Sequence, residues 1–136
     1  MTSSEVSGNS VFITGATSGI GKETTALFLA KGWRVFATAR TDALAIKLHE
    51  EFDHPNLEVI TCEVHIEESC ESAIKRVLEL VPSGPNIIVN NAGFALPAYE
   101  RLYESLYLFL VCAIQLVGFN AECEQQSLTL VSFATF

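Results

Sequence analysis

The chain has 136 residues, 49% of them hydrophobic, and a formal net charge of −8 at pH 7. This length allows a single domain over residues 1–136, and the hydrophobic fraction is high enough to form a core, which excludes a disordered chain. The acidic balance argues against nonspecific binding to nucleic acid or to an acidic lipid surface, because both would repel the chain.

The N-terminal segment is predicted to carry no targeting signal. Residues 1–9 are polar and lack the basic flank of a signal peptide or a transit sequence, so we expect them to be flexible and the protein to be cytoplasmic. A reducing compartment also suits the cysteines, which have no C-x-x-C spacing and no histidine cluster beside them. We therefore expect neither a metal site nor a disulfide framework.

A glycine-rich loop joins the first predicted strand to the first predicted helix. Residues 11–13 are apolar, residues 14–21 read T-G-A-T-S-G-I-G, and residues 22–30 follow a helical pattern that ends before Gly32. A second strand is predicted directly afterwards, over residues 33–39. The segment therefore has the order and length of a β-α-β unit.

Such a loop favours the binding of an anion. A strand that turns sharply into a helix leaves the first amides of the helix unpaired, and these amides attract negative charge together with the positive end of the helix dipole. Gly15 permits the tight turn, Gly19 allows a pyrophosphate to approach the backbone, and Gly21 allows the helix to pack closely on the strand. Glycine loops also serve as simple turns, but the β-α-β context favours a dinucleotide-binding site.

Helices and strands continue to alternate along the chain. Helices are predicted over residues 42–52 and 67–80, and strands over residues 57–62 and 86–90. Short connections between alternating elements imply a parallel sheet with right-handed crossovers and helices on both faces, which is a doubly wound α/β fold. In such a fold ligands bind at the carboxyl ends of the strands. These ends lie near residues 14–21, 38–41, 62–64 and 90–93.

The last third of the chain departs from this alternation. Residues 99–118 are strongly apolar, and the uninterrupted run that begins at Leu106 has nine residues, whereas a membrane span needs about 20. A core or interface helix is therefore favoured over a membrane span, and it offers a contact for a homo- or hetero-oligomer near Leu106. Residues 128–133 are predicted to form a strand beside residues 86–90. The apolar end at Phe136 leads us to expect a C-terminal truncation and a marginally stable or oligomeric chain.

Two motifs carry a resemblance to a known family. Residues 14–21 match T-G-x-x-x-G-[IL]-G and residues 90–93 match N-N-A-G, both at predicted strand ends. From residue 10 to residue 93 the chain thereby resembles the short-chain dehydrogenase/reductase family, whereas residues 94–136 diverge from it. The resemblance implies a Rossmann-like doubly wound parallel sheet, incomplete here with four or five strands. It also implies hydride transfer between a nicotinamide cofactor and a small-molecule carbonyl or alcohol substrate.

The resemblance further implies which residues contact the cofactor. The glycine loop would line the pyrophosphate and the adenosine ribose, and the N-N-A-G motif would bring main chain against the two riboses. Glu63 stands where the family usually has an aspartate that faces the adenine amine, and it is one methylene longer. The implied contacts are Gly15, Thr17, Ser18, Gly19, Ile20, Gly21, Glu63, Val64, Asn90, Ala92 and Gly93.

The charge at the end of the second predicted strand bears on the choice of cofactor. A fold of this kind that prefers NAD holds the ribose 2′-hydroxyl with an acidic residue at this place. This chain has Ala39 there and Arg40 next, and a guanidinium can hold a 2′-phosphate with two parallel hydrogen bonds. The sequence therefore predicts NADP(H) as the cofactor. The alternative is that Arg40 is only a solvated cation of the loop. Some family members add a basic residue within the glycine loop, where this chain has Ser18.

The catalytic pair of the family is missing from this sequence. The family uses Tyr-x-x-x-Lys on a later helix, because a lysine one turn away lowers the tyrosine pKa from its usual value of about 10. The last lysine here is Lys75, which precedes all three tyrosines, so no catalytic residue is assigned. The sequence predicts an NADP(H)-dependent oxidoreductase. Residues 36–40 resemble family members that act on lipid-like or secondary-metabolite ketones. The alternatives are a non-catalytic module that binds NADP(H) or a partner, and an inactive remnant.

Overall fold

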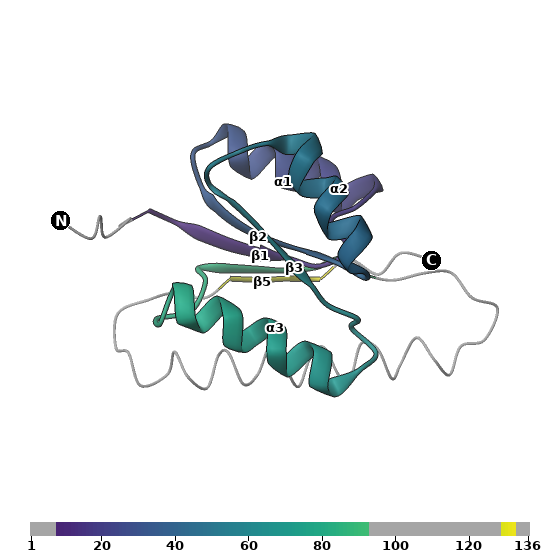
Figure 1. Ribbon diagram of the computed structural model, residues 1–136. Coiled ribbons are helices and arrows are strands. Elements are labelled where there is room, and N and C mark those ends of the chain that lie inside the picture. The colour runs from purple at the N-terminus through teal and green to yellow at the C-terminus, as the bar shows by residue number, and fades with distance from the viewer. Residues whose placement is uncertain (1–7, 93–128, 133–136) are drawn as a thin grey trace, which may run out of the picture.

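The computed structural model describes residues 8–92 and 129–132. Within these residues all strand pairings are parallel, and the strand order in the sheet is β3-β2-β1-β4-β5. Helices α1 and α2 cover one face of the sheet and α3 covers the other (Figure 1). The predicted doubly wound parallel sheet is therefore confirmed. The elements are β1 (Ser10–Ile13), α1 (Gly19–Ala30), β2 (Arg34–Ala39), α2 (Asp42–Phe52), β3 (Leu57–Thr61), α3 (Glu67–Leu80), β4 (Ile87–Asn90) and β5 (Thr129–Ser132).

The elements lie close to their predicted positions, with differences at their ends. The largest difference is at α1, which begins at Gly19 rather than at residue 22. Glycine is a poor helix former, so a pattern of helix-forming residues does not include the two glycines of the first turn. Strand β5 pairs with β4 as predicted, with Thr129 opposite Ile87. The predicted helix over residues 99–118 lies outside the described residues, and no helix within residues 8–92 is long and apolar enough to cross a membrane.

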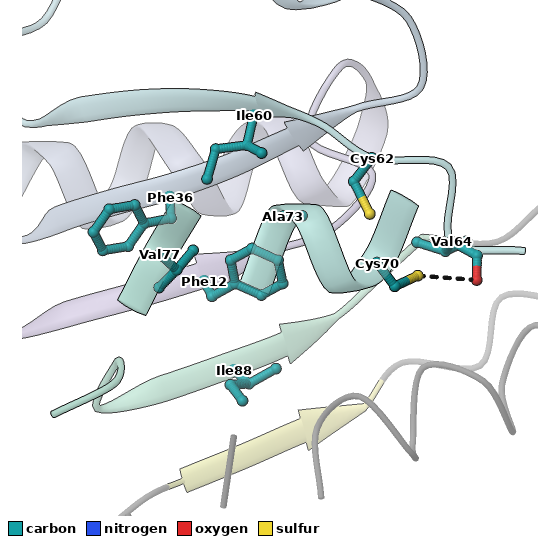
Figure 2. Packing of buried hydrophobic residues seen from close by; sticks show 9 residues of the cluster. All are labelled: Phe12, Phe36, Ile60, Cys62, Val64, Cys70, Ala73, Val77 and Ile88. Atoms are coloured by element: carbon teal, nitrogen blue, oxygen red, sulfur yellow. Dashed lines mark hydrogen bonds between the residues drawn. The ribbon is translucent and has the colours of Figure 1, made fainter. Parts of the chain in front are cut away.

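The central strands are buried on both faces, which explains their nearly continuous apolar sequence. Alternate residues of each strand enter two different clusters. The cluster on the α3 face consists of Phe12, Phe36, Ile60, Cys62, Val64, Cys70, Ala73, Val77 and Ile88 (Figure 2). The cluster under α1 and α2 consists of Val11, Ile13, Ala16, Leu29, Val35, Ala37, Leu48, Leu57 and Val89. Together the two clusters fix the carboxyl ends of β1, β2 and β4 beside one another.

Arg34 joins the start of β2 to the C-terminal end of α3. Its guanidinium carbon lies 5.1 Å from the centre of the Phe36 ring, and Nη1 donates a hydrogen bond of 3.5 Å to the Leu80 carbonyl. A cation at a helix C-terminus and a cation over an aromatic ring each contribute about 0.5–1 kcal/mol to stability.

We expect Arg34→Met to lower the free energy of unfolding by about 1–2 kcal/mol, measured by urea denaturation. Lys47→Met, an exposed change on α2, is the control. An equal effect of the two substitutions would contradict the prediction.

Candidate functional site

The glycine loop between β1 and α1 has a conformation that depends on its glycines. Gly15 and Gly19 have φ angles of 65° and 56°, in the left-handed region that side chains disfavour. A Cβ atom on Gly15 would lie 2.8 Å from the Ala92 Cα atom, and one on Gly21 would lie 2.3 Å from the Gly15 carbonyl oxygen. A Cβ atom on Gly19 would meet nothing within 4 Å among the described residues. Gly15 and Gly21 are therefore packed against protein, whereas Gly19 faces open space.

Thr14 connects the end of β1 to the end of β4. Its hydroxyl oxygen accepts hydrogen bonds from the amides of Asn91 (3.1 Å) and Ala92 (3.0 Å), and its hydroxyl donates to the Val89 carbonyl (3.4 Å). The Asn91 side chain completes the connection, because Nδ2 donates to the carbonyls of Thr14 (3.2 Å) and Gly15 (3.1 Å). Thr14 is only 1% exposed, so these groups have little access to water. The two motifs of the sequence are thus a single hydrogen-bonded unit.

Thr38 holds the same loop from the other side. The Gly15 amide donates to the Thr38 hydroxyl (3.3 Å), and the Ala16 amide donates to the Thr38 carbonyl (3.1 Å). Thr38 is buried in β2, next to β1 in the sheet. Sequence reasoning assigned no role to Thr14, Thr38 or Asn91. The available signal was a polar residue at the end of an otherwise apolar strand, because such a residue needs hydrogen-bond partners when it is buried.

The N-terminal end of α1 leaves hydrogen-bond donors available. Ser18 is the N-cap residue, yet its side chain makes no capping hydrogen bond, and the first turn contains no acidic residue. The first amides of a helix have no acceptor within the helix. Ser18, Gly19 and Ile20 are exposed, and Thr17 is partly buried. The site therefore presents exposed amides and the positive end of a helix dipole, as an anion-binding site requires.

Asn90 adds an acceptor at the end of β4. Its Oδ1 atom is buried and has no hydrogen-bond partner among the described residues. A buried carbonyl oxygen without a donor is costly in a folded protein, so it marks a place where a ligand hydroxyl or amide group would fit. Gly93, the last residue of the second motif, lies outside the described residues.

Arg40 lies in the short connection between β2 and α2. Thr41 caps α2 by accepting a hydrogen bond of 3.3 Å from the Leu44 amide, so the connection is fixed at both ends. Arg40 is exposed, and no carboxylate of the described residues forms an ion pair with it. Its guanidinium is therefore available to a ligand at the carboxyl end of β2.

Glu63 and Val64 follow β3 and differ in accessibility. The Glu63 amide donates to the Ser69 hydroxyl (2.9 Å), and its carboxylate, with 42% of the side chain exposed, lies 3.4 Å from the His65 imidazole. Val64 is 8% exposed and its side chain belongs to the core cluster on the α3 face (Figure 2). Glu63 therefore offers a side chain to the site edge, whereas Val64 offers mainly its backbone.

The parallel sheet brings most of the candidate residues to one edge. The glycine loop, Arg40 and Glu63 follow the carboxyl ends of neighbouring strands, and Asn90 is the last residue of β4. In open α/β sheets this edge forms the ligand crevice. The edge combines backbone donors, a guanidinium and an unpaired acceptor, which suits a ligand with phosphate and hydroxyl groups.

Comparisons with known proteins agree with this geometry. Serine 3-dehydrogenase of Agrobacterium fabrum is 36% identical over 93 residues, which cover 63% of this chain and 34% of that protein. NADP-dependent 3-hydroxy acid dehydrogenase YdfG of Escherichia coli O6:H1 is 35% identical over 100 residues, which cover 69% of this chain and 38% of that protein. NADPH-bound carbonyl reductase from chicken fatty liver is 29% identical, with a TM-score of 0.70 over 82% of this chain and 50% of that structure.

The chain spans about a third of the length of these curated relatives. A family model described as short chain dehydrogenase matches residues 9–106, which include both motifs and all strand ends from β1 to β4. With more than half of its residues matched, the chain belongs to the short chain dehydrogenase family, whose members are oxidoreductases that bind a nicotinamide dinucleotide.

Proposed function

We propose that this chain is the cofactor-binding part of an NADP(H)-dependent short-chain oxidoreductase. The observation that carries the proposal is the arrangement of exposed helix amides and an unpaired guanidinium at one edge of the sheet. The amides at the start of α1 suit a pyrophosphate, and Arg40 suits a further phosphate at the end of β2. NADP(H) carries both groups, whereas NAD(H) lacks the second.

The remaining candidate residues suit the rest of such a cofactor. The open space at Gly19 allows a pyrophosphate to approach the backbone, beside Thr17, Ser18 and Ile20. The buried Oδ1 atom of Asn90 would accept a hydrogen bond from a ribose hydroxyl group, with the main chain of Ala92 and Gly93 beside it. The Glu63 carboxylate would accept from the adenine amine, next to the Val64 backbone. When bound, NADPH would donate a hydride to a carbonyl group, and NADP+ would accept one from an alcohol.

The cofactor preference rests on charge. Ala39 is the last residue of β2, so no carboxylate stands there to receive a ribose 2′-hydroxyl or to repel a 2′-phosphate. Arg40 follows directly and has no ion-pair partner among the described residues. Two similar proteins support the same preference, since one is an NADP-dependent dehydrogenase and the other was solved with NADPH bound.

The proposed reaction is the reduction of a carbonyl group or the oxidation of an alcohol in a small molecule. Within the 136 residues no tyrosine is followed four positions later by a lysine. We therefore propose that this chain alone binds NADP(H) without turning over a substrate. The same observation favours the second candidate function, a non-catalytic module that binds NADP(H) or a partner, for which the predicted helix near Leu106 would serve as the contact.

Titration with NADPH and NADH tests the proposal. We expect the chain to bind NADPH more tightly than NADH, and Arg40→Ala to raise the Kd for NADPH about tenfold, because one charge-assisted contact is lost. The Kd for NADH should change less than about twofold. The readouts are NADPH fluorescence and the emission of Trp33. Arg76→Ala is the matched control, since Arg76 pairs with Glu58 on the α3 side of the chain. Equal weakening of both cofactors by Arg40→Ala, or no NADPH binding at all, would contradict the proposal.

A further inference from the structure

A carboxylate stands close to Arg40 without pairing with it. Asp42 is the first residue of α2, two positions after Arg40, so their Cα atoms are at most about 7 Å apart. Both residues are exposed, and an arginine side chain is long enough to cover that separation. Nevertheless, Asp42 and Arg40 form no ion pair in the structure, and the Asp42 carboxylate has a different partner.

That partner is Thr61, at the end of β3. The Thr61 hydroxyl donates a hydrogen bond of 2.5 Å to Oδ1 of Asp42. The sheet fixes the donor in place, because Thr61 lies opposite Ala39 in the β2–β3 pairing and the Cys62 amide donates to the Ala39 carbonyl at 2.8 Å. The Thr41 cap fixes the start of α2, which carries the acceptor. The Asp42 carboxylate is thus held toward β3 by a donor on a rigid element.

We propose that Thr61 is a positioning residue for cofactor selection, which holds the Asp42 carboxylate away from the Arg40 guanidinium and so keeps that guanidinium available to a 2′-phosphate. The inference rests on the proposed function. Without the Thr61 hydroxyl, the Asp42 carboxylate turns toward Arg40, where it competes with the phosphate for the same donors and repels it. NADH lacks the 2′-phosphate, so its binding does not depend on this arrangement.

Substitution of Thr61 separates this role from a structural one. We expect Thr61→Val to raise the Kd for NADPH about fivefold, because a carboxylate then stands within a few ångströms of the phosphate, and to leave the Kd for NADH unchanged. Thr61→Ser, which keeps the hydroxyl, should restore NADPH binding. In an Asp42→Asn background, Thr61→Val should leave the Kd for NADPH unchanged, because the carboxylate through which the substitution acts is absent. Ser72→Ala, which removes an exposed hydroxyl on α3, is the matched control.

A second measurement needs no cofactor. Phenylglyoxal modifies arginine side chains, and the rate at Arg40 can be followed by mass spectrometry of its peptide. We expect Thr61→Val to slow this modification about threefold by letting Asp42 pair with Arg40, and Asp42→Asn to reverse the slowing. If the wild-type chain fails to bind NADPH, the proposed function fails, while the modification rates still decide the role of Thr61. Unchanged rates in Thr61→Val, or an equal loss of NADPH affinity in the Asp42→Asn background, would overturn the inference.

Discussion

Replacement of Gly21 with alanine is expected to lower the free energy of unfolding by about 2–3 kcal/mol and to raise the Kd for NADPH at least about thirtyfold. The added Cβ atom would lie 2.3 Å from the Gly15 carbonyl oxygen and 2.5 Å from Nδ2 of Asn91. Both distances are far shorter than van der Waals contact, and the Gly15 oxygen belongs to the backbone, so the loop or the start of α1 must move. Either movement displaces the amides on which the proposed pyrophosphate site depends.

A second glycine provides the control for this substitution. Gly32 follows α1 with a φ angle of 79°, and a Cβ atom there would meet nothing within 4 Å among the described residues. Gly32→Ala therefore costs about 1–2 kcal/mol through backbone strain alone, at the end of the helix opposite to the site. Urea denaturation followed by Trp33 fluorescence measures the stability of both variants, and titration measures their NADPH affinity. If Gly32→Ala weakens NADPH binding as much as Gly21→Ala does, the loss of affinity comes from lower stability and not from a changed loop geometry.

The order of elements and the glycine loop are predictable from sequence because both depend on local chemistry. An apolar strand, a glycine turn and an amphipathic helix each leave a pattern within a few neighbouring residues. The start of α1 at Gly19 is the exception, since the low helix propensity of glycine is overcome by packing of the helix against the loop at Gly21. Burial and tertiary contact decided that boundary, and neither is visible in a local pattern.

The contacts that assemble the site connect residues far apart in the chain. The Thr14 hydroxyl meets amides 77 and 78 positions later, and Thr61 meets Asp42 across 19 positions. No periodicity reports such pairs, because they arise from the register of neighbouring parallel strands. The resemblance supplied the positions of the motifs but assigned no role to Thr14, Thr38 or Asn91. These residues hold the loop in place, while the groups proposed to face the ligand lie beside them.

Thr14→Val is expected to lower the free energy of unfolding by about 2 kcal/mol. The substitution preserves side-chain shape but removes the oxygen that accepts hydrogen bonds from the amides of Asn91 and Ala92. A buried amide without an acceptor costs about 1–3 kcal/mol. The Ala92 amide loses its acceptor in this variant, whereas the Asn91 amide keeps its hydrogen bond of 3.1 Å to the Val89 carbonyl. The end of β4 then loosens from the end of β1, so NADPH binding weakens as well.

Another buried threonine separates this effect from the simple loss of a hydroxyl group. Thr25 is 0% exposed, and its hydroxyl donates to the Gly21 carbonyl at 2.8 Å. After Thr25→Val the Gly21 carbonyl still accepts a backbone hydrogen bond within the helix, so the free energy of unfolding is expected to fall by only about 1 kcal/mol. Thr14→Ser, which retains the acceptor, should stay within about 1 kcal/mol of the wild type. Urea denaturation of the three variants tests the argument. Equal losses in Thr14→Val and Thr25→Val would show that the Ala92 amide finds another acceptor and that Thr14 does not hold the two motifs together.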